Sequence, residues 1–179
     1  AKGATNMSAP APAIRENLQL DLAALRRLKY DELDRLYRAA RRPSALSDLN
    51  GDAVGAMLAW RTPRTGPLAW LLRTFGESSI FAWKGKSFQS LSADAGEGIN
   101  RITFFGKRRW FPFGTRFDAS FLDGEPAFVL DYARPGNPPL IKSIVDEVRE
   151  VAPKLYLGPA ALKVRGRARP ILFFAVSLQ

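Results

Sequence analysis

The chain of 179 residues contains no cysteine and no histidine. The missing cysteine excludes disulfide bonds, thiolate metal sites and thiol nucleophiles. The missing histidine excludes imidazole metal ligands, catalytic triads built on histidine and the commonest general base. Any chemistry must therefore use carboxylate, amine, guanidinium, phenol or hydroxyl groups, or a bound cofactor. The sequence offers no cofactor motif, so we predict neither a cofactor nor a metal site.

Long hydrophobic runs are also missing, because no stretch of about 18 apolar residues is present to span a bilayer. We expect a cytoplasmic protein, or one that associates peripherally with a membrane. A chain of 179 residues forms one domain by default and can bury a sizeable core. We interpret residues 1–6 as a cloning remnant, residues 8–13 as a disordered lead-in and residues 14–179 as the domain.

Positive charge is plentiful and unevenly placed. The formal net charge is +10, and residues 61–116 hold 10 basic and 3 acidic side chains, which is +7 of that total. A localised basic region predicts an anionic partner, such as a phospholipid surface, a nucleic acid or an acidic ligand. The candidate residues for an anionic surface are Arg61, Arg64, Arg73, Lys107, Arg108 and Arg109.

The clearest local signal is a β-hairpin between Arg109 and Tyr132. Aromatic and small residues alternate with polar or charged ones through its first half, which is the period of an extended strand. Asp123 and Gly124 supply a tight turn, and the apolar run from Pro126 to Tyr132 forms the returning strand. The alternating positions are Phe111, Phe113, Thr115, Phe117, Ala119 and Phe121.

Helical spacing of apolar residues marks the segments outside this hairpin. Two amphipathic helices are predicted between residues 14 and 40, and they must pack against a sheet or a partner. A short apolar helix over residues 67–75 could cap a barrel mouth, lie in a membrane interface or pack into the core. Another helix is predicted over residues 140–151, where six aliphatic side chains share one face.

The remaining segments have strand character. Strands are predicted over residues 52–60, 79–88 and 99–105, and a final hairpin turns about Gly166. In the second of these, Phe81 and Trp83 are expected on one face, with Lys84 and Lys86 on the other. Because parallel βα units are absent, the seven or eight strands predict a mainly β (α+β) fold. We expect a closed or nearly closed antiparallel barrel, since closure removes exposed sheet edges.

The architecture over residues 46–178 resembles the lipocalin-like, or calycin, family of small barrels. Trp83 in the sequence FAWKGKSF resembles the tryptophan of the Gly-x-Trp motif near the first barrel strand of that family. Here the glycine, Gly85, follows the tryptophan, and the N-terminal helices and the helix before the last hairpin are further departures. The resemblance implies an interior that holds a small apolar molecule.

Aromatic residues on the predicted strands supply the lining of such an interior. Rings with a few polar groups form an apolar binding pocket, although they form an ordinary solid core equally well. The candidate ligand-binding residues are Phe81, Trp83, Phe111, Phe113, Phe117, Phe121, Phe128 and Phe173. We predict a binding protein for a lipid, isoprenoid or polyketide-like molecule, exchanged at an anionic membrane surface.

An enzyme of the same shape is the alternative. A cofactor-free isomerase, cyclase or hydratase could act on an apolar substrate in the cavity by positioning and a few polar groups. Asp131 and Tyr132 are adjacent on a strand, so one of them points inward, and an inward Asp131 would have a raised pKa suited to acid–base work. The catalytic candidates are Asp131, Tyr132 and Tyr156, with Lys84, Lys86, Arg116 and Asp118 in support.

A second alternative uses the basic and aromatic segment of residues 104–113. Interleaved bases and rings are typical of some platforms for single-stranded nucleic acid. The segment lacks the aromatic ribonucleoprotein signature, and a hairpin tip with solvated charges explains it more simply. Nucleic acid therefore ranks as an unlikely partner.

Overall fold

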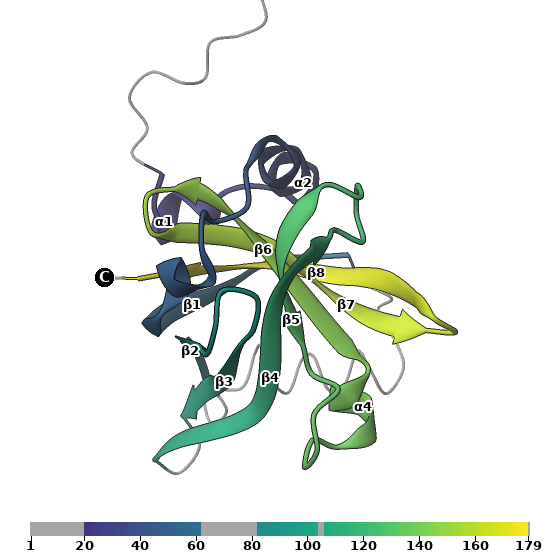
Figure 1. Ribbon diagram of the computed structural model, residues 1–179. Coiled ribbons are helices and arrows are strands. Elements are labelled where there is room, and N and C mark those ends of the chain that lie inside the picture. Colours follow the sequence, from purple (N-terminus) through teal and green to yellow (C-terminus); the bar gives the residue numbers. More distant parts are fainter. Residues whose placement is uncertain (1–19, 62–81, 104–105, 179) are drawn as a thin grey trace, which may run out of the picture.

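The structure is a computed structural model that describes residues 20–61, 82–103 and 106–178 (Figure 1). Eight antiparallel strands each pair with their sequence neighbours, and the last strand returns to the first, so the sheet is a closed barrel. The mainly β barrel predicted from strand spacing is confirmed. The strands are β1 (Gly51–Trp60), β2 (Ala82–Ser90), β3 (Gly96–Thr103), β4 (Lys107–Ala119), β5 (Pro126–Asp131), β6 (Ile144–Ala152), β7 (Leu155–Val164) and β8 (Arg167–Ser177).

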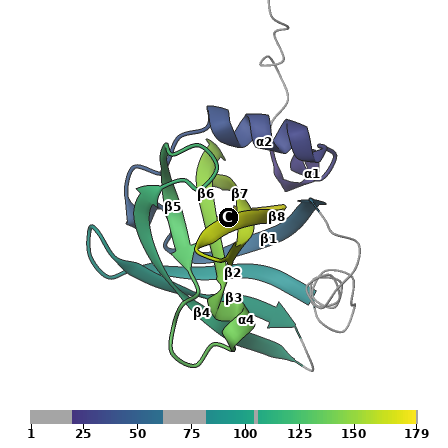
Figure 2. The same ribbon diagram turned by 90° about the vertical axis from the view of Figure 1, so that its right-hand side faces the viewer.

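Short helices cover the barrel from outside. The N-terminal helices α1 (Leu22–Leu25) and α2 (Tyr30–Ala39) lie along one side (Figure 2), where α1 contacts β8 and α2 contacts β6, β7 and β8. A 3-10 helix, η1 (Leu46–Leu49), leads into β1, and α4 (Pro139–Lys142) leads into β6. Within the described ranges, none of the helices has the length and hydropathy needed to cross a bilayer.

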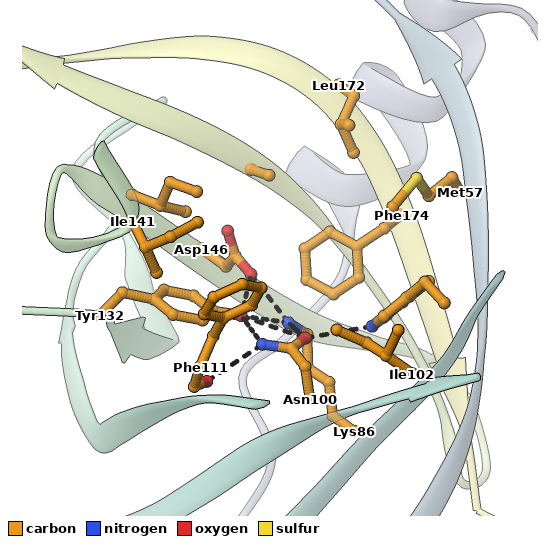
Figure 3. Close-up of a pocket in the computed structure, with 13 residues that line it drawn as sticks. Met57, Lys86, Asn100, Ile102, Phe111, Tyr132, Ile141, Asp146, Leu172 and Phe174 are labelled. Atoms are coloured by element: carbon orange, nitrogen blue, oxygen red, sulfur yellow. Dashed lines mark hydrogen bonds and ion pairs between the residues drawn. The ribbon is translucent and has the colours of Figure 1, made fainter. Parts of the chain in front are cut away.

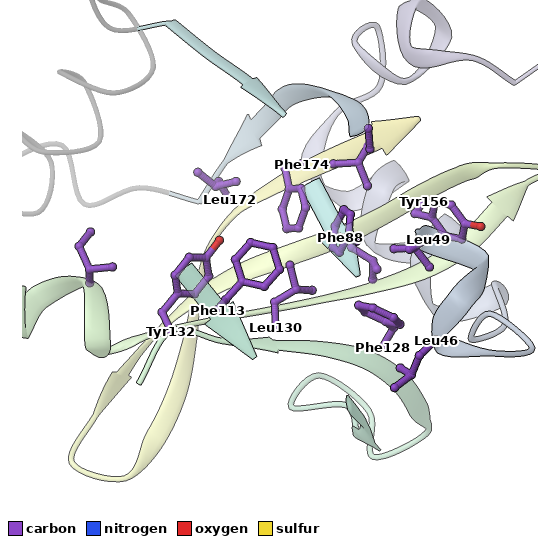
Figure 4. Close-up of a cluster of buried hydrophobic side chains, with 14 residues drawn as sticks. Leu46, Leu49, Phe88, Phe113, Phe128, Leu130, Tyr132, Tyr156, Leu172 and Phe174 are labelled. Atoms are coloured by element: carbon purple, nitrogen blue, oxygen red, sulfur yellow. The ribbon is translucent and has the colours of Figure 1, made fainter. Parts of the chain in front are cut away.

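One end of the barrel interior is filled with side chains (Figure 4). Leu46 and Leu49 of η1 pack there with Phe128 and Tyr156, and all four are almost fully buried. Edge-to-face contacts join Phe88 to Phe128 at 6.0 Å between ring centroids. Interlocked rings and aliphatic groups of this kind leave little free space at this end.

A second apolar cluster lies on the outer face of the barrel, beneath α1 and α2. It joins Leu25, Leu33 and Tyr37 of the helices to Phe173 and Ala175 of β8. Successive residues of a strand point to opposite faces. Several strands are therefore buried on both faces: the barrel core covers the inner face, and the helices cover the outer face.

The helix predicted over residues 140–151 is wrong for most of its length. Only Pro139–Lys142 is helical, and Ile144–Ala152 is the strand β6. The aliphatic residues of this segment are mainly β-branched, which favours a strand. Both faces of β6 are buried, so its apolar residues do not alternate with exposed polar ones and the period of a half-buried strand is lost.

Candidate functional site

The end of the barrel next to α4 is hollow. A partly open cavity of about 120 Å³ occupies it (Figure 3). An apolar protein cavity of roughly 150 Å³ can hold benzene, so this space suits a small ring or a short chain. Its apolar walls are Met57, Trp83, Ile102, Phe111, Ile141, Ile144, Ala160, Leu172 and Phe174, and its polar lining residues are Lys86, Asn100, Tyr132 and Asp146.

These four polar residues, which we call the inner polar network, meet around the ammonium group of Lys86. The Lys86 side chain is only 4% exposed. Its Nζ donates to Asn100 Oδ1 at 3.0 Å, to Asp146 Oδ2 at 3.0 Å and to the hydroxyl of Tyr132. A protonated lysine has three donors, so every one of them has an acceptor inside the barrel.

Aromatic rings surround the same ammonium group. Lys86 Nζ lies 5.1 Å from the ring centroids of Phe113, Tyr132 and Phe174. The indole of Trp83 is 5.5 Å away. A cation within about 6 Å of ring faces is attracted by their negative potential, which offsets part of the cost of removing it from water.

Asn100 and Tyr132 are also fully hydrogen-bonded. Asn100 Oδ1 accepts from Lys86 and, at 3.0 Å, from Trp83 Nε1. Its Nδ2 donates to the carbonyl of Phe111 at 3.2 Å and to Tyr132 Oη at 3.1 Å. The Tyr132 hydroxyl donates in turn to Asp146 Oδ2 at 3.1 Å.

Asp146 joins the network through only one of its two carboxylate oxygens. Its side chain is 5% exposed, and Oδ2 accepts from both Lys86 and Tyr132. Oδ1 is equally buried and has no hydrogen-bond partner among the described residues. Figure 3 shows this oxygen turned away from the other polar groups, toward the space between Ile141 and Phe174. A buried oxygen without a partner is costly unless something else satisfies it.

Burial shifts the pKa values within the network. Desolvation lowers the pKa of Lys86, and the adjacent Asp146 carboxylate opposes this shift only in part. Desolvation and the same carboxylate hold the pKa of Tyr132 well above 10.0. Tyr132 therefore remains a neutral hydroxyl that donates to Asp146, while Lys86 loses its proton more readily than a surface lysine.

A β-bulge places Lys86 inside the barrel. Between β2 and β3, Trp83 pairs with Ile102 and Gly85 with Arg101, so Lys84 is an extra residue on β2. The extra residue reverses the alternation, and Trp83 and Lys86 both face the cavity, although they were expected on opposite faces. Gly85 permits this arrangement, because a Cβ there would lie 2.0 Å from the carbonyl oxygen of Ala53.

A second bulge lies between β3 and the next strand, β4. Ile99 pairs with Pro112 and Asn100 with Trp110, so Phe111 is the extra residue on β4. Phe111 has a positive φ of 58°, which is strained for a residue with a bulky side chain. The hydrogen bond from Asn100 Nδ2 to the Phe111 carbonyl holds this conformation, so one side chain both supports Lys86 and positions the ring of Phe111.

The structure separates the three predicted catalytic residues. Tyr132 points into the cavity, whereas Asp131 lies on the outer face, 3.3 Å from Lys163 Nζ and 3.5 Å from Arg116. Burial alone would raise the pKa of Asp131, but the backbone N–H of Ala133 and the Lys163 ammonium outweigh it, and the pKa is lowered. Tyr156 lies at the filled end, where its hydroxyl donates to the carbonyl of Asp48 at 3.2 Å.

The predicted aromatic lining divides into three groups. Trp83 and Phe111 line the cavity, and Phe113 lies beneath Lys86. Phe117 and Phe128 pack against each other in the filled part, with ring centroids 5.9 Å apart. The remaining predictions were Phe81, which lies outside the described residues, and Phe121 and Phe173, which are discussed next.

Phe121 and Phe173 were expected inside the barrel and lie on its outer face. Phe173 packs beneath the helices, with its ring centroid 5.0 Å from that of Tyr30. Its neighbour Phe174 takes the inward position, since adjacent residues of a strand cannot share a face. Phe121 follows the end of β4, so the alternation no longer applies to it, and it packs against Val129, Val145 and Ala161 outside.

The predicted basic residues remain candidates for an anionic surface. Arg61 is exposed, and Arg109 is 63% exposed and lies 3.6 Å from Asp52. Lys86, which contributed to the basic count of this region, is instead buried and paired with Asp146. Arg64 and Arg73 lie outside the described residues, as does the helix predicted over residues 67–75. Lys107 and Arg108 belong to β4. Binding of single-stranded nucleic acid by this segment stays a prediction.

Sequence reasoning missed the central position of two charged residues, Lys86 and Asp146, which line the cavity and pair with each other. Lys86 was only a supporting candidate, and Asp146 fell within the helix predicted over residues 140–151, which is the strand β6 in the structure. In the described part of the chain, no group of three or more carboxylates is arranged to hold a metal ion. The apolar walls of the site suit an apolar ligand. Lys86 has no donor left for such a ligand, whereas Asp146 Oδ1 can accept a hydrogen bond from it.

Comparisons with known proteins show the fold. No protein-family model matches the sequence, and no curated protein matches it either. The chain is similar in structure to a protein from Thermomonospora curvata, with a TM-score of 0.53 and 17% sequence identity. The match covers 88% of this chain and 92% of that chain. At this identity, the likeness extends to the barrel architecture alone.

Proposed function

We propose that the protein binds a small, mainly apolar molecule inside the barrel, as its resemblance to lipocalin-like proteins implies. The observation that carries this proposal is the cavity of about 120 Å³, which has apolar walls and a buried polar network at one side. Ligand pockets commonly combine an apolar lining with a few polar groups that fix orientation. The barrel interior is hollow at this end and filled at the other, so the space is localised.

Exchange of the ligand at an anionic surface forms part of the proposal. The net charge of +7 over residues 61–116 supports it, although Asp146 neutralises the charge of Lys86. Surface arginines such as Arg61 and Arg109 would attract anionic phospholipids, and salt would weaken that attraction. Binding to vesicles that contain phosphatidylserine, measured at 50 and 500 mM salt, tests this part separately.

A cofactor-free isomerase, cyclase or hydratase is a second candidate. The observation that favours it is the Asp146 carboxylate, which faces the cavity beside two groups with shifted pKa values, Lys86 and Tyr132. Perturbed ionisable groups in a pocket are frequent at catalytic sites. A carboxylate oxygen positioned over an apolar substrate could remove a proton from one atom and return it to another.

Binding is tested by isothermal titration with 1,4-dimethylbenzene, together with native mass spectrometry of the purified protein. We expect saturable binding with one molecule per chain. Ala160→Leu should fill the cavity and abolish binding, because Ala160 lines the cavity wall. The matched control is Ala119→Leu at an exposed position of β4, which should bind as the wild type does. If the wild type binds nothing, or if Ala160→Leu binds normally, the proposed site is wrong.

A further inference from the structure

The hydrogen-bonding capacity of the inner polar network can be counted group by group. Lys86 uses three donors, and both the amide oxygen and the amide nitrogen of Asn100 have two partners each. The Tyr132 hydroxyl donates once, to Asp146 Oδ2. Among the described residues, the one position left without a partner is Asp146 Oδ1, an acceptor. The network therefore lacks a donor, and it has no surplus donor to offer.

We propose that the cavity selects an apolar alcohol or phenol, whose uncharged hydroxyl donates to Asp146 Oδ1 while its carbon skeleton packs against the apolar walls. This inference rests on the proposed function, because it names the chemical class of the ligand bound there. The hydroxyl would supply the missing donor, and a hydrogen bond to a charged acceptor is stronger than one between neutral groups.

Other polar end groups fit the network less well. A ketone, ether or carboxylate brings only acceptors, so its oxygen would face the oxygen of Asp146 without a proton between them. An amine cation could donate to Asp146, but its charge would lie near that of Lys86 in a site that already contains one balanced ion pair. A neutral hydroxyl donates without adding charge.

Covalent capture of a carbonyl compound by Lys86 is also disfavoured. A lysine that attacks a carbonyl must be neutral and must present its lone pair to the ligand. Each N–H of Lys86 is directed at a network partner, and four aromatic rings surround the ammonium group. Lys86 therefore acts as a positioning residue, because it holds the carboxylate of Asp146 in place through an ion pair. Asp146 itself makes the contact with the ligand.

Three small probes of similar shape test this selectivity on the wild-type protein. In 4-methylphenol one methyl group of 1,4-dimethylbenzene is replaced by a hydroxyl, and in 4-methylanisole that hydroxyl is methylated. Calorimetric titration should show that 4-methylphenol binds about tenfold more tightly than either of the others, as expected for a charge-assisted hydrogen bond.

An isosteric substitution sharpens the test. In Asp146→Asn, the amide oxygen should remain toward the donors Lys86 and Tyr132, which turns the amide NH₂ into the cavity. The open acceptor then becomes a donor, and the preference should invert so that 4-methylanisole binds more tightly than 4-methylphenol. Asp118→Asn, at an exposed carboxylate of β4, is the matched control and should retain the wild-type order.

The outcomes separate this inference from the proposed function. A tenfold preference for 4-methylphenol in the wild type supports it, even if the Asp146→Asn protein fails to fold. Equal affinities, or affinities that follow hydrophobicity alone, would overturn the inference while leaving the proposed function intact. If none of the three probes binds, the proposed function fails and the inference fails with it.

Discussion

Two adjacent carboxylates on β6, Asp146 and Glu147, face opposite sides of the barrel and are both buried. Outside, Glu147 Oε1 accepts from Tyr37 at 2.8 Å and from Ser120, and Oε2 accepts from the backbone N–H of Phe121 at 3.0 Å. Both oxygens of Glu147 are thus satisfied by the chain. Inside, only Oδ2 of Asp146 is satisfied by the described residues.

Arg149, on the same outer face as Glu147, also has all of its hydrogen-bonding groups satisfied by the chain. Its guanidinium binds both carboxylate oxygens of Asp123, at 2.7 and 2.8 Å. The remaining donors reach the carbonyls of Tyr37, Glu125 and Pro126. All five N–H groups of the arginine therefore have acceptors. We call Tyr37, Ser120, Asp123, Glu147 and Arg149 the outer polar network.

The difference between the two networks indicates what each is for. The outer network links α2 to β6 and to the turn after β4, and it needs nothing beyond the chain. The inner network surrounds a cavity and has an acceptor that the described residues leave open. A buried polar group left unsatisfied is costly to stability, so its retention points to a partner from outside.

The largest expected effect comes from removing the charge of Lys86 alone. Lys86→Met leaves Asp146 ionised and unpaired in the barrel, which should lower the free energy of unfolding by about 3–5 kcal/mol. In Lys86→Met/Asp146→Val both charges are gone, so most of that loss should be recovered. Urea unfolding measures both. A double variant no more stable than the single one would show that the ion pair is not the source of the effect.

Glu147→Gln should have a smaller effect, and on stability alone. The amide keeps one acceptor oxygen but turns an NH₂ toward a donor, so a group such as the backbone N–H of Phe121 loses its partner. We expect the free energy of unfolding to fall by about 1–3 kcal/mol. Affinity for 4-methylphenol should stay at the wild-type value in calorimetry. A change of tenfold or more in affinity would mean that the two networks do not act separately.

The two networks should respond to pH with opposite signs. Burial lowers the pKa of Lys86, so between that folded-state pKa and the usual 10.5 the unfolded chain binds more protons, and stability rises with pH. Burial raises the pKa of Glu147, so from the usual 4.5 up to its folded-state pKa the folded chain binds more protons, and stability falls as pH rises. Each slope is at most about 1.4 kcal/mol per pH unit.

Urea titrations across pH, compared between the wild type and two variants, isolate these slopes. Glu147→Gln should abolish the acidic slope and retain the alkaline one. The Lys86→Met/Asp146→Val protein should show the reverse. If both slopes persist in both variants, other groups are responsible for the pH dependence.

The smallest expected effect concerns Tyr156, a buried hydroxyl that belongs to neither network. Tyr156→Phe removes its hydrogen bond to the carbonyl of Asp48 at the filled end. We expect a loss of about 0.5–1.5 kcal/mol in the free energy of unfolding and no change in ligand affinity. Thermal unfolding combined with titration of 4-methylphenol measures both. A change in the affinity for 4-methylphenol would mean that the filled end of the barrel influences ligand binding in the cavity.

Strand periodicity predicted much of the architecture. Alternation around Phe113 and the turn at Gly124 gave the β4–β5 hairpin, and consecutive antiparallel strands gave a closed barrel. The same alternation brought Trp83, Phe111 and Tyr132 into consideration, and all three line the cavity. The hairpin and barrel predictions succeeded because they depend on local pattern and on the need to close a sheet.

The charged members of the site could not be found in the same way. The bulge at Lys84 reversed the alternation, so Lys86 was assigned to the outside. Gly85, within a strand, was the available signal, since glycine there often marks a bulge or a close approach. Asp146 was missed because β6 is buried on both faces, which hides its period. That double burial depends on α2, far away in the sequence.

The central claim is that Asp146 Oδ1 accepts a hydrogen bond from the hydroxyl of a bound apolar ligand. A crystal structure of the complex with 4-methylphenol tests it most directly. The account predicts the ring among the apolar walls of the cavity, with its oxygen about 2.5–2.7 Å from Asp146 Oδ1. A ring bound with its hydroxyl turned away from Asp146, or a protein group already bonded to Oδ1, would contradict the claim.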